Sequence, residues 1–200
     1  MIPLGLLKYG KVKFVWTWWC AIWKRPLDSF DEWLRKAWIK IEDWEFKTYE
    51  VIEKPKKNIM FPEFSVTATE ALITYLAFAK GVDYDITVYQ CATEPHVQNL
   101  IEFLNNAWAD ITINTDHTIV VKPWTLNIKN KDFYITSDYL EAGTYFAIGA
   151  WADNSEITIK NCHVDDLSSM YNIAEKIWVI ASYYFVIFSN KLELLWFYVS

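Results

Sequence analysis

Two sets of residues recur at a nearly constant interval along the 200-residue chain. The cysteines Cys20, Cys91 and Cys162 are evenly spaced, and the tryptophans Trp38, Trp108 and Trp178 repeat at almost the same interval. Self-similarity at a fixed period indicates one supersecondary unit that is used repeatedly. The interval therefore restricts the fold to three copies of a unit of about 70 residues.

The first helix of the unit carries a recurring start signal. Residues 68–80 have helical periodicity, and the helix is expected to end at Gly81. The pattern Thr67-x-x-Glu70 before it is a capping box, with Thr67 as the N-cap. A second capping box lies downstream of this one, at the same interval that separates the cysteines. A second glycine lies upstream of Gly81 at that interval. The landmarks that share this spacing are Thr67 with Asp138, Glu70 with Glu141, and Gly10 with Gly81.

The rest of the middle unit reads as a strand, a second helix and two more strands. Residues 85–90 alternate as a strand. Residues 94–107 read as a helix with Thr93 as N-cap and Pro95 in the first turn. DITIN and TIVVK follow as a hairpin-like pair. The unit is therefore β-α-β-α-β-β, which predicts an α/β fold.

The repeat also predicts two domains. On this period Met1 falls inside the first helix of its unit, and the third unit ends early. We expect residues 1–135 to be most of a first domain and residues 136–200 to be the truncated beginning of a second. The pattern is that of a fragment, or of a split or misread gene.

Tryptophan and glycine are present in unusual proportions. The chain has 12 Trp and 5 Gly, whereas about 7% Gly is usual, which is about 14 residues here. Several tryptophans follow a predicted helix end, where the left-handed backbone favours glycine, and four crowd the segment around Cys20. We infer that UGA codons for glycine have been read as tryptophan; the alternative is a Trp-rich surface that contacts carbohydrate or membrane. The tryptophans concerned are Trp16, Trp18, Trp19, Trp23, Trp38, Trp108, Trp151 and Trp178.

The net charge and the spacing of the cysteines limit which kinds of ligand and site the chain can have. A net charge of −6 disfavours nucleic acid, which would require a basic stripe. Three widely spaced cysteines fit neither a disulfide framework nor a zinc site, so a reducing cytosol and no metal are expected. No signal peptide is evident. The longest apolar run, IWVIASYYFVIFS, is too short to cross a bilayer, which takes a helix of about 20 residues.

Four segments carry a resemblance to a known enzyme family. They are CAIWKRPLD, FSVTATEALI, CATEPHVQNLIEFLNNAWADI and DYLEAGTYFAIGA. In collinear order they resemble UDP-N-acetylglucosamine 1-carboxyvinyltransferase over about residues 1–180. The resemblance implies an inside-out α/β barrel built from β-α-β-α-β-β units. It also implies transfer of enolpyruvyl from phosphoenolpyruvate to the 3′-hydroxyl of UDP-N-acetylglucosamine, the first committed step of peptidoglycan synthesis, in the cytoplasm and without a cofactor.

The resemblance assigns roles to individual residues. Cys20 matches the catalytic cysteine, which protonates C3 of phosphoenolpyruvate. A glycine-rich segment around that thiol would let it close over the substrate and exclude water. Glu63 stands where the family often has Lys, and Thr17 where it usually has Pro. Two stretches match contacts to the UDP-sugar, Arg25, Pro26, Leu27, Asp28 and Ser29, and Glu63, Phe64, Ser65 and Val66.

Other chemically active residues read as structural. Cys91 and Cys162 end strands and are expected to be buried and inert. Asp138 and Glu141 are interpreted mainly as capping residues. The histidines His96, His117 and His163 form no recognisable constellation.

Two alternatives to the enzyme remain at this point. One is a non-catalytic remnant that binds a UDP-sugar. The other is the related 3-phosphoshikimate 1-carboxyvinyltransferase, which Cys20 and the KRPLD run disfavour. The expected partners are the two small substrates and the missing N- and C-terminal parts of the same enzyme, with no nucleic acid and no membrane.

Overall fold

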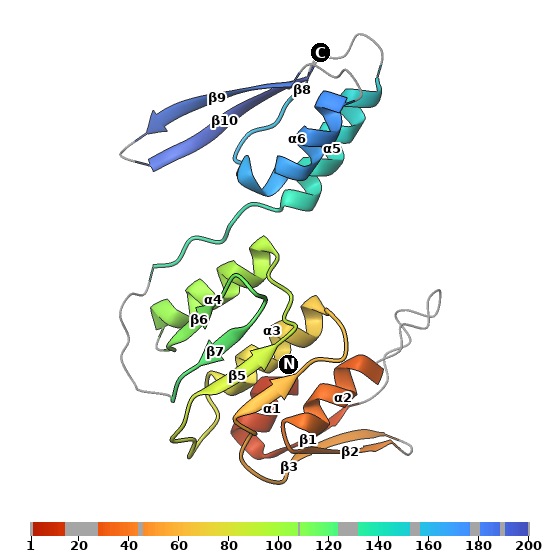
Figure 1. Ribbon diagram of the computed structural model, residues 1–200, viewed down its shortest axis with the longest axis vertical. Helices are drawn as coiled ribbons and strands as arrows, with labels where there is room; N and C mark the ends of the chain where they lie inside the picture. Colours follow the sequence, from red (N-terminus) through yellow and green to blue (C-terminus); the bar gives the residue numbers. More distant parts are fainter. Residues whose placement is uncertain are drawn as a thin grey trace. The chain divides into compact units, whose positions relative to one another are not determined.

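The computed structural model describes residues 2–14, 28–43, 46–107, 109–123, 132–152, 157–176, 181–188 and 191–199. The chain divides into two compact units, Met1–Tyr134 and Ile135–Ser200. This division falls next to the boundary expected from the repeat, while the reading of the units as a first and a truncated second domain stays a prediction. Figure 1 shows the elements of each unit.

In its described residues, unit 1 holds one set of strands and helices that begins with a helix and a second, complete set that begins with a strand. Its elements are α1 (Ile2–Tyr9), β1 (Lys11–Phe14), α2 (Asp28–Lys36), β2 (Ile39–Asp43), β3 (Lys47–Val51), β4 (Asn58–Met60), α3 (Val66–Leu76), β5 (Ile86–Tyr89), α4 (Pro95–Ala107), β6 (Ile111–Ile113) and β7 (Ile119–Val121). From β4 to β7 the order is β-α-β-α-β-β, so the predicted unit is confirmed.

The strands of unit 1 form two small sheets. One has the order β1-β3-β2 and is antiparallel throughout. The other has the order β4-β5-β7-β6. In this second sheet β4 and β5 are parallel, because α3 connects them as a crossover, and the remaining pairs are antiparallel.

Helix α3 lies at the centre of unit 1 and packs against α1, α2 and α4 (Figure 1). Six of its residues are buried: Ala68, Thr69, Leu72, Ile73, Tyr75 and Leu76. A buried stripe this wide is typical of a helix inside a core, and the other helices cover it. The sheets contribute one face each to the same cluster, through residues such as Ile86 and Val88.

Backbone geometry repeats with the sequence period. Gly10 and Gly81 have φ of +71° and +70°. Gln90 and Asn161, which are separated by the same interval as the cysteines, have φ of +58° and +55°. Each of these two precedes a buried cysteine, Cys91 or Cys162, whose Sγ faces the carbonyl three residues earlier. The repeat therefore describes local conformation as well as residue type.

The start and end of α3 differ from the sequence prediction. The N-cap is Ser65, not Thr67: Ser65 has an extended backbone, and its Oγ accepts from the Ala68 N–H at 3.4 Å. The helix ends at Leu76 rather than at residue 80. Serine is at least as good an N-cap as threonine, and the earlier hydroxyl caps the helix. Thr67 is then an exposed residue of the first turn.

The predicted cap of α4 is also wrong. Helix α4 begins at Pro95, one residue later than the sequence predicts, and the backbone carbonyl of Glu94 accepts from the N–H groups of Val97 and Gln98. The Thr93 hydroxyl lies 3.2 Å from a ring nitrogen of His117 instead. Tertiary structure has taken this hydroxyl away from the helix start.

Unit 2 is smaller and has its own cluster of buried residues. Its elements are α5 (Tyr139–Trp151), β8 (Ile157–Thr158), the 3₁₀ turn η2 (Asp165–Leu167), α6 (Ser168–Lys176), β9 (Ala181–Phe188) and β10 (Lys191–Val199). The sheet has the order β8-β10-β9. At Gly143 an added Cβ would lie 2.6 Å from the Met170 sulfur, so glycine is needed for this close approach.

Two sequence interpretations in unit 2 are decided by α5. Asp138 is its N-cap, since Oδ1 accepts from Leu140 N–H at 2.8 Å and from Glu141 N–H at 3.2 Å. Trp151 is the last helical residue, and the following Ala152 has φ of −80°. The expectation that Trp151 occupies a left-handed, glycine-favouring helix stop is therefore wrong. Among the described residues, no helix is long and apolar enough to cross a membrane.

Candidate functional site

Three segments of unit 1 meet at one edge of the β4-β5-β7-β6 sheet. Parallel pairing puts the carboxyl ends of β4 and β5 together, and the chain enters α3 and α4 from there. Strand β7 runs antiparallel to β5, so the turn at residues 114–118 lies at the same edge. In α/β sheets, ligands commonly bind at the carboxyl ends of the strands. The segment Glu63–Val66 lies at this edge, directly before α3.

The start of α3 is fixed by buried hydrogen bonds. Thr69 is fully buried, and its Oγ1 donates to the Ser65 carbonyl at 2.8 Å. The same oxygen accepts from the Ala92 N–H at 3.0 Å. These bonds tie the segment before α3 to the segment before α4. A fixed helix N-terminus with unpaired N–H groups is a natural place for an anion.

Phe64 and His117 form an aromatic pair on this edge. Their ring centroids are 5.1 Å apart at an interplanar angle of 74°. Phe64 is 58% exposed and His117 is exposed as well. His117 Nδ1 lies 3.2 Å from Thr93 Oγ1 and 3.3 Å from the Cys91 carbonyl oxygen. His117 thus connects the hairpin turn to the segments before both helices.

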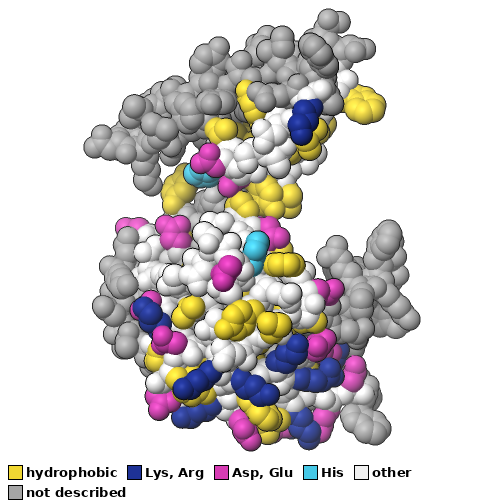
Figure 2. Space-filling view, in the orientation of Figure 1, with side chains coloured by type: hydrophobic (Ala, Val, Ile, Leu, Met, Phe, Trp, Pro, Cys, Tyr) yellow, Lys and Arg dark blue, Asp and Glu magenta, His cyan; other side chains and the backbone are white. Residues whose placement is uncertain are grey.

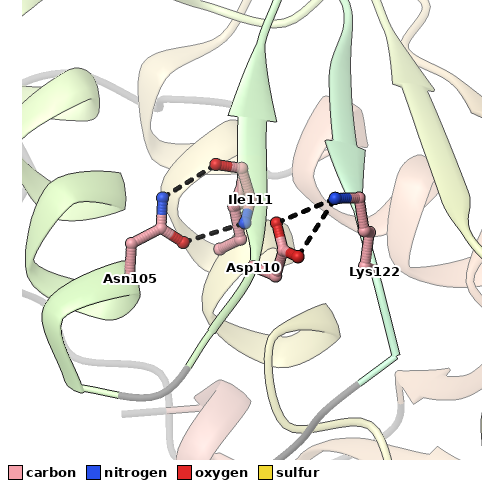
Figure 3. A network of polar contacts seen from close by, with 4 residues as sticks. All are labelled: Asn105, Asp110, Ile111 and Lys122. Atoms are coloured by element: carbon pink, nitrogen blue, oxygen red, sulfur yellow. Dashed lines mark hydrogen bonds and ion pairs between the residues drawn. The ribbon is translucent and has the colours of Figure 1, made fainter. Parts of the chain in front are cut away.

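Hydrogen bonds stabilise the turn that carries His117, and others attach the far end of the same hairpin to α4. Asp116 Oδ1 accepts from the hydroxyl of Thr118 at 2.5 Å and from its N–H at 3.2 Å. The bond from that hydroxyl is the main reason why the pKa of Asp116 lies below its ordinary value. Figure 3 shows the other end of the hairpin, where the Asn105 amide exchanges two 2.8 Å bonds with the backbone of Ile111.

Most of the predicted stretch Arg25 to Ser29 lies outside the described residues. Cys20, Arg25, Pro26 and Leu27 lie outside the described residues. Asp28 and Ser29 are the first two residues of α2. The structure therefore brings together only the second stretch, Glu63 to Val66, and adds Thr93 and His117 to it.

A buried ion pair joins the two ends of the segment that contains Cys20. Lys47 pairs in register with Phe14, the last described residue before that segment, and Asp31 lies in α2, just after it. The Lys47 ammonium bonds the Asp31 carboxylate, and both residues are at most 4% exposed. Tyr49 OH donates to Asp31 at 3.1 Å. Burial and then the Asp31 charge raise the pKa of Tyr49 far above its ordinary value. Removal of Lys47 would leave the buried Asp31 carboxylate without an ion-pair partner, so the network holds both ends in place.

Two cysteines have the inert environment that the sequence predicts. Burial raises the pKa of the Cys91 thiol to about 12, and burial also raises the pKa of Cys162. A thiol that stays protonated is a poor nucleophile. In the described part of the chain, no three His, Cys, Asp or Glu side chains are placed to hold a metal ion.

The site residues missed by sequence reasoning are Thr93 and His117. Thr93 was expected to cap a helix, and His117 stood without a partner in the sequence. The T-D-H-T stretch signals a turn, but only the packing of the hairpin on α4 reveals which side chains the turn reaches.

Comparison with known proteins identifies the family of the chain. Residues 2–181 match the family model described as EPSP synthase (3-phosphoshikimate 1-carboxyvinyltransferase). The chain belongs to the EPSP synthase family. The family model thus matches both units, and it also includes the segment that contains Cys20.

Similar proteins carry a narrower name. UDP-N-acetylglucosamine 1-carboxyvinyltransferase from Wolbachia sp. subsp. Brugia malayi is 33% identical over 189 residues, which is 92% of this chain and 42% of the relative. The protein of that name from Pelagibacter ubique is 32% identical over 86% of this chain and 40% of its own length. The chain therefore spans about two fifths of the length of these relatives.

A solved structure supports the fold. The enolpyruvyl transferase NikO from Streptomyces tendae superimposes with a TM-score of 0.72 over 100% of this chain and 45% of its own, at 12% sequence identity. EPSP synthase from Acinetobacter baumannii gives a TM-score of 0.62 over 88% of this chain and 40% of its own. The expected enolpyruvyl transferase-like α/β fold is thereby confirmed.

Proposed function

We propose that this chain is part of an enzyme that transfers enolpyruvyl from phosphoenolpyruvate to the 3′-hydroxyl of UDP-N-acetylglucosamine. The product and inorganic phosphate would leave, and the reaction would open peptidoglycan synthesis in the cytoplasm. The observation that carries this proposal is the similarity over 92% of the chain to a protein named for this reaction. The Cys20 segment and the KRPLD run support the same substrate choice.

By its resemblance to the catalytic cysteine of the family, Cys20 is proposed as the acid. Its thiol would donate a proton to C3 of phosphoenolpyruvate, which leaves positive charge at C2. The 3′-oxygen of the sugar would then form a bond to C2 and lose its proton. Loss of phosphate from C2 and of a proton from C3 would restore the double bond. A proton donor at carbon must be well positioned, and water must be kept from the reactive C2.

The remaining proposed site residues hold the nucleotide. Arg25 has a rigid, permanently charged guanidinium that suits a carboxylate or phosphate. It would act with Pro26, Leu27, Asp28 and Ser29, residues that end at the first turn of α2. Glu63, Phe64, Ser65 and Val66 would contact the UDP-sugar, since they lead into the N-terminus of α3. The acidic side chain of Glu63, in place of a lysine, disfavours a contact of that side chain with the diphosphate.

The remaining parts of the same enzyme are the proposed protein partner. Unit 2 supports this through the exposed face of α5, where Tyr145 and Ile148 are 54% and 55% exposed. In the repeat, the matching residues are Thr74 of α3, which is half-buried, and Ala77 at its end, which is 2% exposed. An apolar helix face of this size is normally covered. Further helices of the second domain would cover it as α1 and α2 cover α3.

The choice between the two enzyme names is tested by ligand preference. The family description names 3-phosphoshikimate, which is therefore the alternative acceptor. We expect the chain to bind UDP-N-acetylglucosamine saturably in titration calorimetry and not to bind shikimate 3-phosphate. Arg25→Ala should weaken the binding more than Arg25→Lys, because lysine keeps the charge. Binding of shikimate 3-phosphate alone would contradict the proposal.

Turnover separates the enzyme from the non-catalytic alternative. With the remaining parts of the enzyme present, the proposal predicts release of phosphate from phosphoenolpyruvate that depends on the UDP-sugar. UDP-sugar binding without phosphate release would favour the remnant that only binds.

A further inference from the structure

His117 is held in place more firmly than an exposed surface histidine requires. Its backbone is left-handed, with φ of +60°. Its carbonyl accepts from the Cys91 N–H at 2.9 Å, so the turn is hydrogen-bonded to the end of β5. Non-glycine residues in this conformation are uncommon, and they often occur at functional sites.

The His117 ring is oriented by two neighbours. Nδ1 lies within 3.3 Å of the Cys91 carbonyl and within 3.2 Å of Thr93 Oγ1. The Cys91 carbonyl can only accept a hydrogen from Nδ1, whereas the Thr93 hydroxyl can donate to Nδ1 or accept from it, so each tautomer keeps a hydrogen bond at this nitrogen. Both neighbours belong to the segment before α4. The ring therefore has one preferred orientation although it lies at the surface.

This orientation presents the ring to Phe64. The contact is edge-to-face, with centroids 5.1 Å apart. Such pairs are stabilising beyond the area that they bury. Phe64 is 58% exposed and would otherwise be free to change rotamer. It is the residue directly before the α3 cap, in the middle of the stretch Glu63–Val66.

We propose that His117 is a positioning residue for the UDP-sugar, acting through Phe64 on the stretch Glu63–Val66. This inference rests on the proposed function, because that function supplies the ligand. Ordering Phe64 before the ligand arrives would reduce the entropy that binding has to overcome. His117 would thereby increase affinity without contacting the reacting atoms.

The test is a set of variants measured by titration calorimetry with UDP-N-acetylglucosamine. His117→Gly removes the ring and suits the left-handed backbone. Gln90→Gly is the matched control, because Gln90 is exposed, has φ of +58° and lies at the same edge. Phe64→Leu removes the other ring. The free energy of unfolding of each variant is measured in urea alongside.

We expect His117→Gly and Phe64→Leu each to raise Kd about three- to tenfold, the range that an aromatic pair supplies. The Kd of the double variant should be no higher than that of the single variant that binds less tightly, because both substitutions remove the same contact. Gln90→Gly should leave Kd unchanged, because it changes only a left-handed position at the same edge. The free energies of unfolding verify that each variant is folded at the temperature of the titration.

Three results would overturn the inference. They are an unchanged Kd in His117→Gly, an equal loss of affinity in Gln90→Gly, and fully additive effects in the double variant. A parent chain that binds no UDP-N-acetylglucosamine would instead refute the proposed function, and the inference with it.

Discussion

Trp38 follows α2 with a backbone φ of +61°, a conformation that glycine adopts far more easily than any other residue. The sequence predicted such a left-handed helix stop here, and the structure confirms it. The ring lies under Lys56, with the ammonium 4.8 Å from the ring centroid. Trp108 and Trp178, the equivalent residues of the next two units, lie outside the described residues.

Replacement of Trp38 tests the backbone argument. We expect Trp38→Gly to unfold with a free energy about 1 kcal/mol higher than Trp38→Ala, because alanine keeps the strain of the left-handed backbone. Both variants lose the ring, so the comparison isolates φ. Urea unfolding measures the difference. Equal stability, or a more stable alanine variant, would contradict the assignment.

Trp33 bears on whether the tryptophans stand for glycine. It is fully buried, and its indole N–H has no hydrogen-bond partner among the described residues. A buried donor without a partner costs about 1–3 kcal/mol. The proposed reading of UGA as glycine applies to all 12 tryptophans of the chain, Trp33 included. Peptide mass spectrometry of the protein from its own host should show glycine at residues 33 and 38; tryptophan there would contradict the proposal.

Buried acidic groups make the stability depend on alkaline pH. Burial raises the pKa of Cys91 to about 12 from an ordinary 9.0, and that of Tyr75 to about 12 from 10.0. Above pH 9 the unfolded chain loses these protons while the native chain keeps them. The unfolded state then binds fewer protons, so the free energy of unfolding falls as pH rises from about 9 to 12.

Urea unfolding from neutral pH to pH 11 measures this dependence. Cys91→Ala should make the decrease shallower, because one of the groups is gone. A free energy of unfolding that stays constant or rises over this interval would contradict the burial of these groups.

Among the elements, the start of α3 shows what the sequence could and could not predict. The pattern predicted a helix with a hydroxyl N-cap, and both exist. Ser65 and Thr67 are both good caps, and local sequence does not decide between them. The bond from Ala92 to Thr69, which fixes the start of the helix, joins two segments that are distant in the sequence and has no local signal.

Alanine substitutions distinguish the two caps. Ser65→Ala should lower the free energy of unfolding by about 1 kcal/mol, because the Ala68 N–H loses its acceptor. Thr67→Ala is the control and should change it by less than about 0.5 kcal/mol, as an exposed position does. Urea unfolding gives both values. A larger loss of unfolding free energy in Thr67→Ala than in Ser65→Ala would show that Thr67 is the N-cap, as the sequence predicted.

Only part of the candidate site could be predicted, because contacts between distant segments have no local signal in the sequence. Resemblance located the stretch Glu63–Val66, and parallel pairing of β4 with β5 explains its place at the carboxyl edge. His117 joins it only because the β6–β7 hairpin folds back over the start of α4. Such convergence depends on tertiary packing, which residue spacing does not encode.

For the whole molecule, the even spacing of the cysteines and of the matching helix ends predicted most of the architecture. It indicated the β-α-β-α-β-β unit and the α/β class. The assignment of residues 1–135 and 136–200 to two domains of one enzyme stays a prediction. The spacing did not predict that α3 would be central, because helix burial depends on the neighbours that surround it. Figure 2 shows acidic and basic side chains mixed over one face of unit 1.

Proton exchange at C3 of phosphoenolpyruvate tests the central claim most directly. The measurement is deuterium incorporation at C3 in D₂O, with this chain and the remaining parts of the enzyme present. The account predicts incorporation that requires UDP-N-acetylglucosamine and is lost in Cys20→Ala. Exchange at the parent rate in Cys20→Ala, or exchange driven by shikimate 3-phosphate in place of the UDP-sugar, would contradict it.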